Sequence, residues 1–144
     1  MRISQKADYA LRALLDLALN ARKGTPVPTS EIARRARVPR KFLESILVEL
    51  RKAGLVASRR GPDGGHLLSR EPEAITLGKI RAAVDGPLRV VERARQRPGD
   101  PLDAGLRQVW GEVEGGIEGL LERITLEDIC RRVDASRKVA DFSI

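Results

Sequence analysis

The sequence has 144 residues but only one cysteine, one histidine and few aromatic side chains, and these shortages exclude several classes of site. A single thiol, Cys130, rules out an intrachain disulfide and any zinc or iron–sulfur site built from several cysteines of one chain. Aromatic residues make up 3%, which argues against a nucleic-acid reader that stacks bases on exposed rings. No apolar run approaches the roughly 18 residues of a spanning helix, and no signal peptide is visible. We therefore expect a cytoplasmic protein with no metal site, no cofactor and no membrane partner.

The same shortages speak against an enzyme. One histidine, one cysteine, no glycine-rich phosphate loop and no clustered carboxylates are too few to assemble a nucleophile with its base. We expect no catalytic residues.

Positive charge is present in excess, and it lies in one half of the chain. The formal net charge is +7, from 27 Lys and Arg against 20 Asp and Glu. Residues 1–75 hold 15 basic and 8 acidic residues, whereas residues 76–144 hold 12 of each. This asymmetry favours one module that faces nucleic acid and one neutral module.

Three helices are predicted in the basic half. Ser4 can cap a helix to about Ala21, with an apolar stripe of Ala7, Leu11, Leu14, Leu15 and Ala18. After a proline-rich break, Thr29 or Ser30 can cap a short helix, 31–37, with Ile32, Ala33 and Ala36 inward. The strongest pattern is a helix over 40–53, ended by Gly54. It turns Phe42, Leu43, Ile46, Leu47 and Leu50 inward and Arg40, Lys41, Glu44, Ser45, Arg51 and Lys52 outward.

A two-stranded hairpin is predicted next. Residues 55–58 and 66–69 have strand composition, and the loop between them carries glycines together with Arg59, Arg60, Gly61 and Pro62. Thr76 can then cap a helix to about Val84. Residues 88–103 are charged and contain Pro and Gly, so we place a module boundary there.

The neutral half is predicted to hold one long helix, from about 102 to 123. Apolar residues recur at spacings of four and three, which is typical of helices that pack side by side. They are Leu106, Trp110, Val113, Ile117, Leu120 and Ile124. Gly111, Gly115 and Gly119 indicate either close approach of a partner helix or a helix that is weak until it docks. A short helix over 125–133 and a loosely attached tail after Asp134 should follow.

This order of elements predicts a mainly α fold with a small β-hairpin wing: a winged helix-turn-helix plus a long C-terminal dimerisation helix. The expected parts are a DNA-binding domain (1–84), a linker (85–101) and a dimerisation helix with its tail (102–144). A helix about 10–12 Å across fits the major groove, and an arginine-bearing hairpin suits phosphates or a narrow minor groove. The candidate DNA-binding residues are Arg40, Lys41, Glu44, Ser45, Arg51, Lys52, Arg59, Arg60, Gly61 and Pro62.

The sequence also resembles the Rrf2-type bacterial transcriptional regulators. The resemblance spans nearly the whole chain, and its most specific piece is the Arg-Gly-x-x-Gly-Gly wing at 60–65. It implies a homodimer joined by the long C-terminal helix, DNA reading by Lys41, Glu44 and the wing at 60–62, and, by family habit, repression. The matching segments are 1–4, 8–14, 31–33, 42–44, 50–56, 60–66, 75–77, 85–88, Trp110 and 124–126.

The chain departs from that family at two places. Many members hold an iron–sulfur cluster with three cysteines, and residues 87–110 contain none, so this chain resembles the cluster-free branch. Sensing would then use a small molecule, a partner protein or one thiol. In the wing, His66 stands where the family usually has tyrosine.

Several alternatives stay open at this level. Cys130 is either buried packing or a redox sensor whose pKa is lowered by Arg131 and Arg132. His66 either packs the wing, touches a phosphate or reports pH. The whole protein is expected to be a homodimeric regulator of a near-palindromic operator, with a winged-helix protein-interaction module or a nonspecific nucleoid protein as the alternatives. A basic recognition face speaks against the interaction module, and the ratio of specific to nonspecific affinity separates the nucleoid protein.

Overall fold

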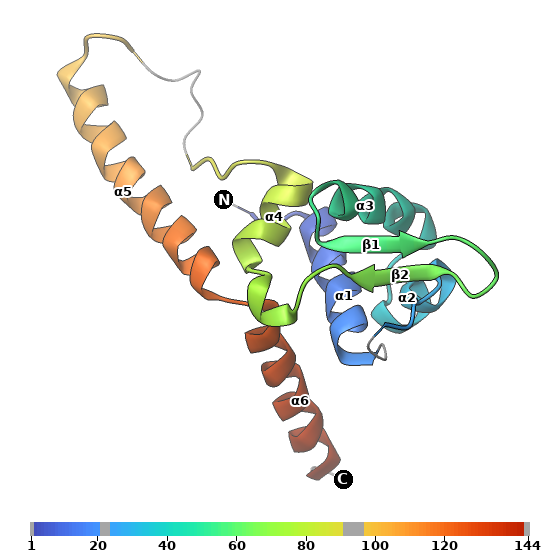
Figure 1. The fold of residues 1–144 in the computed structure, drawn as a ribbon. Helices are drawn as coiled ribbons and strands as arrows, with labels where there is room; N and C mark the ends of the chain where they lie inside the picture. Colours follow the sequence, from blue (N-terminus) through green and yellow to red (C-terminus); the bar gives the residue numbers. More distant parts are fainter. Residues whose placement is uncertain (1, 21–23, 91–96, 143–144) are drawn as a thin grey trace.

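The computed structural model describes residues 2–20, 24–90 and 97–142, and its elements follow the predicted order (Figure 1). Helices and strands of the first half form the winged helix, and two longer helices complete the chain. The bounds are α1 Gln5–Asn20, α2 Thr29–Ala36, α3 Arg40–Lys52, β1 Val56–Arg59, β2 Gly65–Leu68, the 3-10 turn η1 Pro72–Ala74, α4 Leu77–Asp85, α5 Pro101–Arg123 and α6 Leu126–Phe142.

Helix α1 occupies the centre of the body and packs against α2, α3, α4 and α6. Ser4 caps it as predicted, because its Oγ accepts a hydrogen bond of 2.9 Å from the Ala7 amide. The buried face includes Ala10, Ala13 and Leu17, while Leu11 and Leu15 of the predicted stripe are only half-buried. Small alanines allow the neighbouring helices to approach on several sides, so the buried surface is wider than one stripe.

Helix α2 begins at Thr29, and the prediction that Thr29 or Ser30 caps it through its side chain was wrong. Pro28 holds the N-cap position, where no side-chain hydrogen bond forms. Its carbonyl instead accepts from the Glu31 and Ile32 amides at 3.1 and 3.2 Å. The Thr29 hydroxyl bonds the His66 ring, so the tertiary contact has taken the group that a local cap would use.

The hairpin confirms the predicted wing. Strands β1 and β2 are antiparallel, with Ser58 opposite His66 and Arg59 opposite Gly65. The edge of β2 also bridges the segment before α2, where the Val27 amide donates to the His66 carbonyl at 3.0 Å. Gly65 is required there, since its φ is +153° and a Cβ would collide with the backbone of Val27.

The C-terminal helix is longer than predicted, and its first turns are anchored in the core. Thr125 and Asp128 exchange side-chain to backbone hydrogen bonds of 2.9 and 3.1 Å, which starts α6 firmly. Leu126 and Cys130 enter the core against α1. The tail expected after Asp134 is helical, because α6 continues to Phe142, but residues 134–141 are all exposed, in line with the expected loose attachment. An ion pair of 3.8 Å between Asp134 and Arg137 supports this extension.

Helix α5 extends away from the body, and its far end lies well clear of the other helices (Figure 1). Asp100 caps it, accepting a hydrogen bond of 3.0 Å from the Leu102 amide, so it begins one residue before the predicted start. None of its residues is buried. Part of the expected linker, residues 91–96, lies outside the described residues. Among the described helices none is long and apolar enough to cross a membrane.

Candidate nucleic-acid interface

Helix α3 divides its side chains as the sequence predicts, with one exception. Leu43, Ile46, Leu47 and Leu50 are buried against the body. The other face is open, and it carries all six predicted polar residues in exposed positions. They are Arg40, Lys41, Glu44, Ser45, Arg51 and Lys52.

The exception is Phe42, which was predicted to be core but is 44% exposed. One residue turns a helix by about 100°, so Phe42 lies well to the side of Leu43, at the edge of the body, where part of its ring stays exposed. Its ring stacks on Tyr9 of α1, with 6.1 Å between centroids and 26° between planes. The Lys41 ammonium lies 4.9 Å from the ring centroid.

The polar contacts on this face are weak and leave the side chains available. Arg40 Nε lies 3.4 Å from Glu44 Oε1, and both side chains are more than 60% exposed. Exposed pairs of this kind contribute at most about 1 kcal/mol, so a ligand of this face could replace them readily. Ser45 Oγ donates to the Phe42 carbonyl at 3.0 Å.

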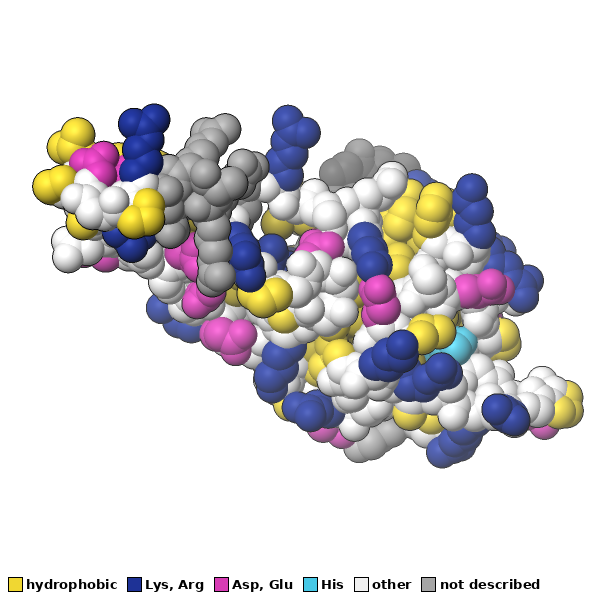
Figure 2. All heavy atoms as spheres, turned by 90° about the horizontal axis from the view of Figure 1, so that it is seen from above, with side chains coloured by type: hydrophobic (Ala, Val, Ile, Leu, Met, Phe, Trp, Pro, Cys, Tyr) yellow, Lys and Arg dark blue, Asp and Glu magenta, His cyan; other side chains and the backbone are white. Residues whose placement is uncertain are grey.

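The wing presents its basic residues at the surface. Arg59, Arg60, Gly61 and Pro62 are all exposed. Arg59 reaches the Gly24 carbonyl at 3.4 Å, and no hydrogen bond or ion pair holds the Arg60 side chain to the described residues. Figure 2 shows Lys and Arg side chains spread over the winged-helix part, while hydrophobic side chains lie among acidic and basic ones at the free end of α5.

His66 joins the wing to the helix-turn-helix. Its Nε2 lies 2.9 Å from Thr29 Oγ1 at the start of α2, and its Nδ1 lies 2.9 Å from Ser58 Oγ on β1. Burial, and to a smaller extent the positive charge of Arg51, lowers the pKa of His66 below its usual 6.5. At neutral pH the ring is therefore uncharged, and of the interpretations left open this favours wing packing.

Two ion pairs that brace the helices were not predicted. Arg35 of α2 donates to buried Asp16 of α1 at 3.0 Å, and Arg35 also pairs with Glu31 at 3.2 Å. Lys6 of α1 contacts Glu49 of α3 at 2.6 Å. The one signal in the sequence is Asp16 itself, a carboxylate inside an apolar helix segment, which requires a partner when buried.

Cys130 lies in the core, 6% exposed. Burial raises the pKa of its thiol, and the carboxylates of Glu127 and Asp134 raise it further. Arg131 does not act in the opposite direction as expected, because it is exposed and pairs with Glu127 at 3.4 Å. The surroundings of Cys130 favour packing over redox sensing.

The predicted seam on α5 is largely open in the single chain. Leu106, Trp110, Val113 and Leu120 are 39–55% exposed, and Ile117 and Ile124 are half-buried. A Cβ added at Gly111, Gly115 or Gly119 would meet nothing within 4 Å, so the space beside these glycines is open in the single chain.

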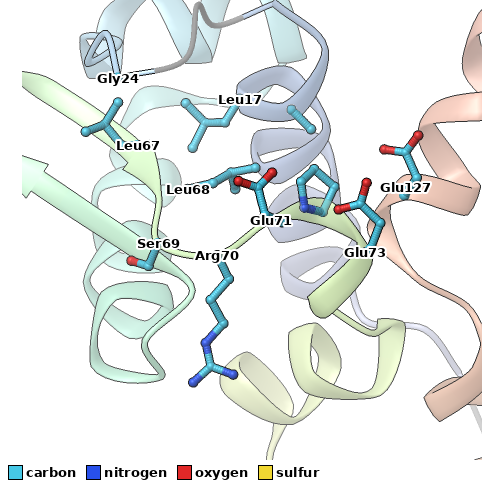
Figure 3. Close-up of a pocket in the computed structure, with 11 residues that line it drawn as sticks. Leu17, Gly24, Leu67, Leu68, Ser69, Arg70, Glu71, Glu73 and Glu127 are labelled. Carbon is cyan, nitrogen blue, oxygen red and sulfur yellow. The ribbon is translucent and has the colours of Figure 1, made fainter.

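A cavity of about 770 Å³ lies between the wing and the C-terminal half. Leu17 and Leu68 contribute to its apolar floor, and Glu73 and Glu127 stand at one side, while Arg70 points away (Figure 3). The cavity therefore combines an apolar floor with an acidic edge, at the junction of α1, β2, η1 and α6.

A short helix, a tight turn, an exposed second helix and an arginine-bearing hairpin together define a winged helix-turn-helix DNA-binding protein. Comparison with known proteins specifies the family. Residues 3–132 match the Rrf2 family, described as iron-dependent transcriptional regulators, and the chain belongs to this family. It is a DNA-binding transcriptional regulator of the Rrf2 type.

Named relatives and solved structures agree with this assignment. An HTH-type, Rrf2-like regulator of Rhodobacter capsulatus is 37% identical over 96% of this chain and 99% of its own length. The regulator IscR of Serratia proteamaculans is 36% identical over 93% of this chain and 82% of its own. Among structures, CymR, the global cysteine regulator of B. subtilis, superposes with a TM-score of 0.77 at 33% identity, covering 92% of this chain and 98% of CymR. IscR of T. potens gives 0.74 at 33% identity, covering 94% and 90%.

Proposed function

We propose that the protein is a homodimeric, sequence-specific repressor that competes with polymerase at a near-palindromic operator, acting in the cytoplasm and without catalytic activity. The observation that carries this proposal is the outward face of α3, which presents six polar side chains beside an exposed arginine wing. A basic face of this kind matches the phosphates and base edges of a DNA groove better than the surface of another protein.

In this proposal α3 enters the major groove and the wing follows the neighbouring backbone. Lys41 and Glu44 lie in the first turns of α3, where a recognition helix meets base edges, and they discriminate bases. Arg51 and Lys52 lie in its last turn and neutralise phosphates together with Arg59. Arg60, whose side chain is exposed at the hairpin, enters the minor groove.

Dimerisation through α5 is supported by its unpartnered apolar seam. The seam exposes four large apolar side chains on a helix that packs on little else, and contact of these side chains with water is unfavourable. They are Leu106, Trp110, Val113 and Leu120. A two-fold axis at this seam would place the two α3 helices at half-sites one helical turn apart, about 34–36 Å.

The residues present do not fit an iron–sulfur cluster, although the family is described as iron-dependent. The sequence supplies one thiol, Cys130, which is buried in the core with a raised pKa. Across the described residues no group of three or more His, Cys, Asp or Glu is placed to hold a metal ion. We therefore propose that DNA binding is controlled by a small molecule or a partner protein.

The experiment that tests the proposal is enrichment of genomic DNA fragments by the purified, metal-free protein at near-physiological salt, followed by sequencing. A shared palindromic site is the expected result, and the neighbouring genes indicate the signal. If all sequences are enriched to the same extent, the protein is a nonspecific nucleoid protein instead. No enrichment with or without cell extract would refute DNA binding and favour a protein-interaction module.

The assignment of roles within the interface is tested by two matched substitutions on α3. Arg51→Ala should weaken binding to all DNA and reduce the salt slope by about one unit, since it removes one phosphate contact. Glu44→Ala should instead change which operator sequence is preferred. Equal effects of both variants on every sequence would contradict this division of roles.

A further inference from the structure

We propose that Phe42 contacts the methyl group of a thymine in the major groove and so determines part of the operator sequence. The inference rests on the proposed function, because it requires α3 to enter the groove. It assigns a base-reading role to an apolar residue that the helical pattern placed in the core.

Exposure and position carry the inference. Phe42 is 44% exposed although the body offers buried surface to its neighbours Leu43 and Ile46. It is the third residue of α3, and the first turn of a recognition helix is the part that meets base edges. Lys41 and Ser45, the exposed residues that flank it in the first turns, are polar, so the ring is the apolar side chain at this end of α3.

The chemistry of the groove offers one apolar partner for such a ring. Each base pair presents hydrogen-bond donors and acceptors in the major groove, and thymine adds its C5-methyl group. A phenyl side chain has no hydrogen-bonding group and can select only this methyl. A protein partner would require a larger apolar patch than one ring, and polar residues surround Phe42 on α3.

The ring is also held in place before DNA arrives. Tyr9 stacks on it from α1 with 6.1 Å between centroids, which ties the ring to the central helix of the body. The Lys41 ammonium lies 4.9 Å from the same centroid, and phosphates or a guanine would draw this cation away. A preorganised ring loses little freedom on contact, so even one methyl group can contribute to specificity.

Thymine-to-uracil scanning of the operator tests the inference, because uracil differs from thymine only by the missing methyl group. Each thymine of one half-site is replaced singly, and affinity is measured for the wild type, Phe42→Ala and Phe42→Leu. At one thymine the wild type should bind the uracil operator about fourfold more weakly, the factor that corresponds to one buried methyl group. Phe42→Ala should bind both operators equally, and Phe42→Leu should retain part of the difference.

The outcomes separate this inference from the proposed function. If the wild type binds the operator specifically but no uracil substitution weakens it, the role of Phe42 is refuted and the function stands. The same holds if Phe42→Ala keeps the full thymine preference. If the wild type prefers no sequence at all, the proposed function fails and the inference fails with it. If Phe42→Ala does not fold, Phe42→Leu takes its place, and an unchanged thymine preference in Phe42→Leu refutes the role of Phe42.

Discussion

Truncation of Trp110 to alanine should separate the proposed dimer into monomers without unfolding the winged helix. Trp110 is the tenth of the 23 residues of α5, 43% exposed in the single chain, on a helix with no buried residue. The body should therefore lose little when the indole is removed. In a dimer that covers this seam, Trp110→Ala should remove the interface contacts of two indoles, one from each protomer.

The size of the effect follows from the exposed area. An indole side chain of about 250 Å² that is 43% exposed leaves about 110 Å² open, and two-fold symmetry doubles this to about 220 Å². At about 25 cal/mol per Å², covering that area stabilises the dimer by about 5 kcal/mol. Alanine retains some contact, so we expect a loss of about 3–5 kcal/mol, equivalent to a dimer dissociation constant weakened about 100- to 5,000-fold.

Sedimentation equilibrium over a range of protein concentrations measures this constant directly. Phe42→Ala is the matched control, because Phe42 is an aromatic residue with 44% exposure that lies on α3 instead of α5. It should leave the dimer constant unchanged and alter DNA binding. If Trp110→Ala leaves the dimer intact, or if both variants weaken it equally, the seam on α5 is not the interface.

Three further predictions concern the body. Asp16→Asn should lower the free energy of unfolding by about 2–4 kcal/mol in urea, because it removes the buried charge, 3% exposed, that faces Arg35 and leaves Arg35 only its pair with Glu31. Asp8→Asn, in an exposed pair with Arg12, should change it by less than about 0.5 kcal/mol, and similar losses in both would contradict the importance of burial. The pKa of His66 is lowered on folding, so protons favour the unfolded chain and stability should fall as the pH drops below about 6.5. His66→Gln should remove that part of the pH dependence, and an unchanged pH profile would refute the assignment. Because burial raises the pKa of Cys130, a thiol reagent at pH 8 should modify the native protein more slowly than the denatured chain, and equal rates would contradict burial.

Local signals predicted most of the elements correctly. Ser4 and Thr76 cap the helices they were expected to cap, and Gly54 follows α3 with a φ of +77°. The strands pair across the loop that contains the predicted glycines. Each of these features depends on residues a few positions apart, so periodicity and capping rules are sufficient to find it.

The errors occur where distant segments compete for the same group. The Thr29 hydroxyl looked like a cap for α2, but His66, 37 residues away, takes it. Phe42 fits an apolar stripe, but it lies at the edge of the body, where Tyr9 covers one side of the ring and the rest is exposed. The length of α6 was underestimated because its anchor depends on Leu126 and Cys130 docking against α1.

The amino-acid sequence by itself determined the order of elements, the basic half and the polar face of α3, because these follow from composition and helical or strand period. It also determined that one chain cannot supply three thiolates for a cluster. Only the tertiary structure decided which side chains are free to meet DNA and which brace the body. Burial and partners such as Asp16 with Arg35, or His66 with Thr29, arise between segments that are adjacent in space but not along the chain. That is the physical reason why Phe42, which the sequence pattern placed in the core, lies exposed beside Tyr9 on the recognition face.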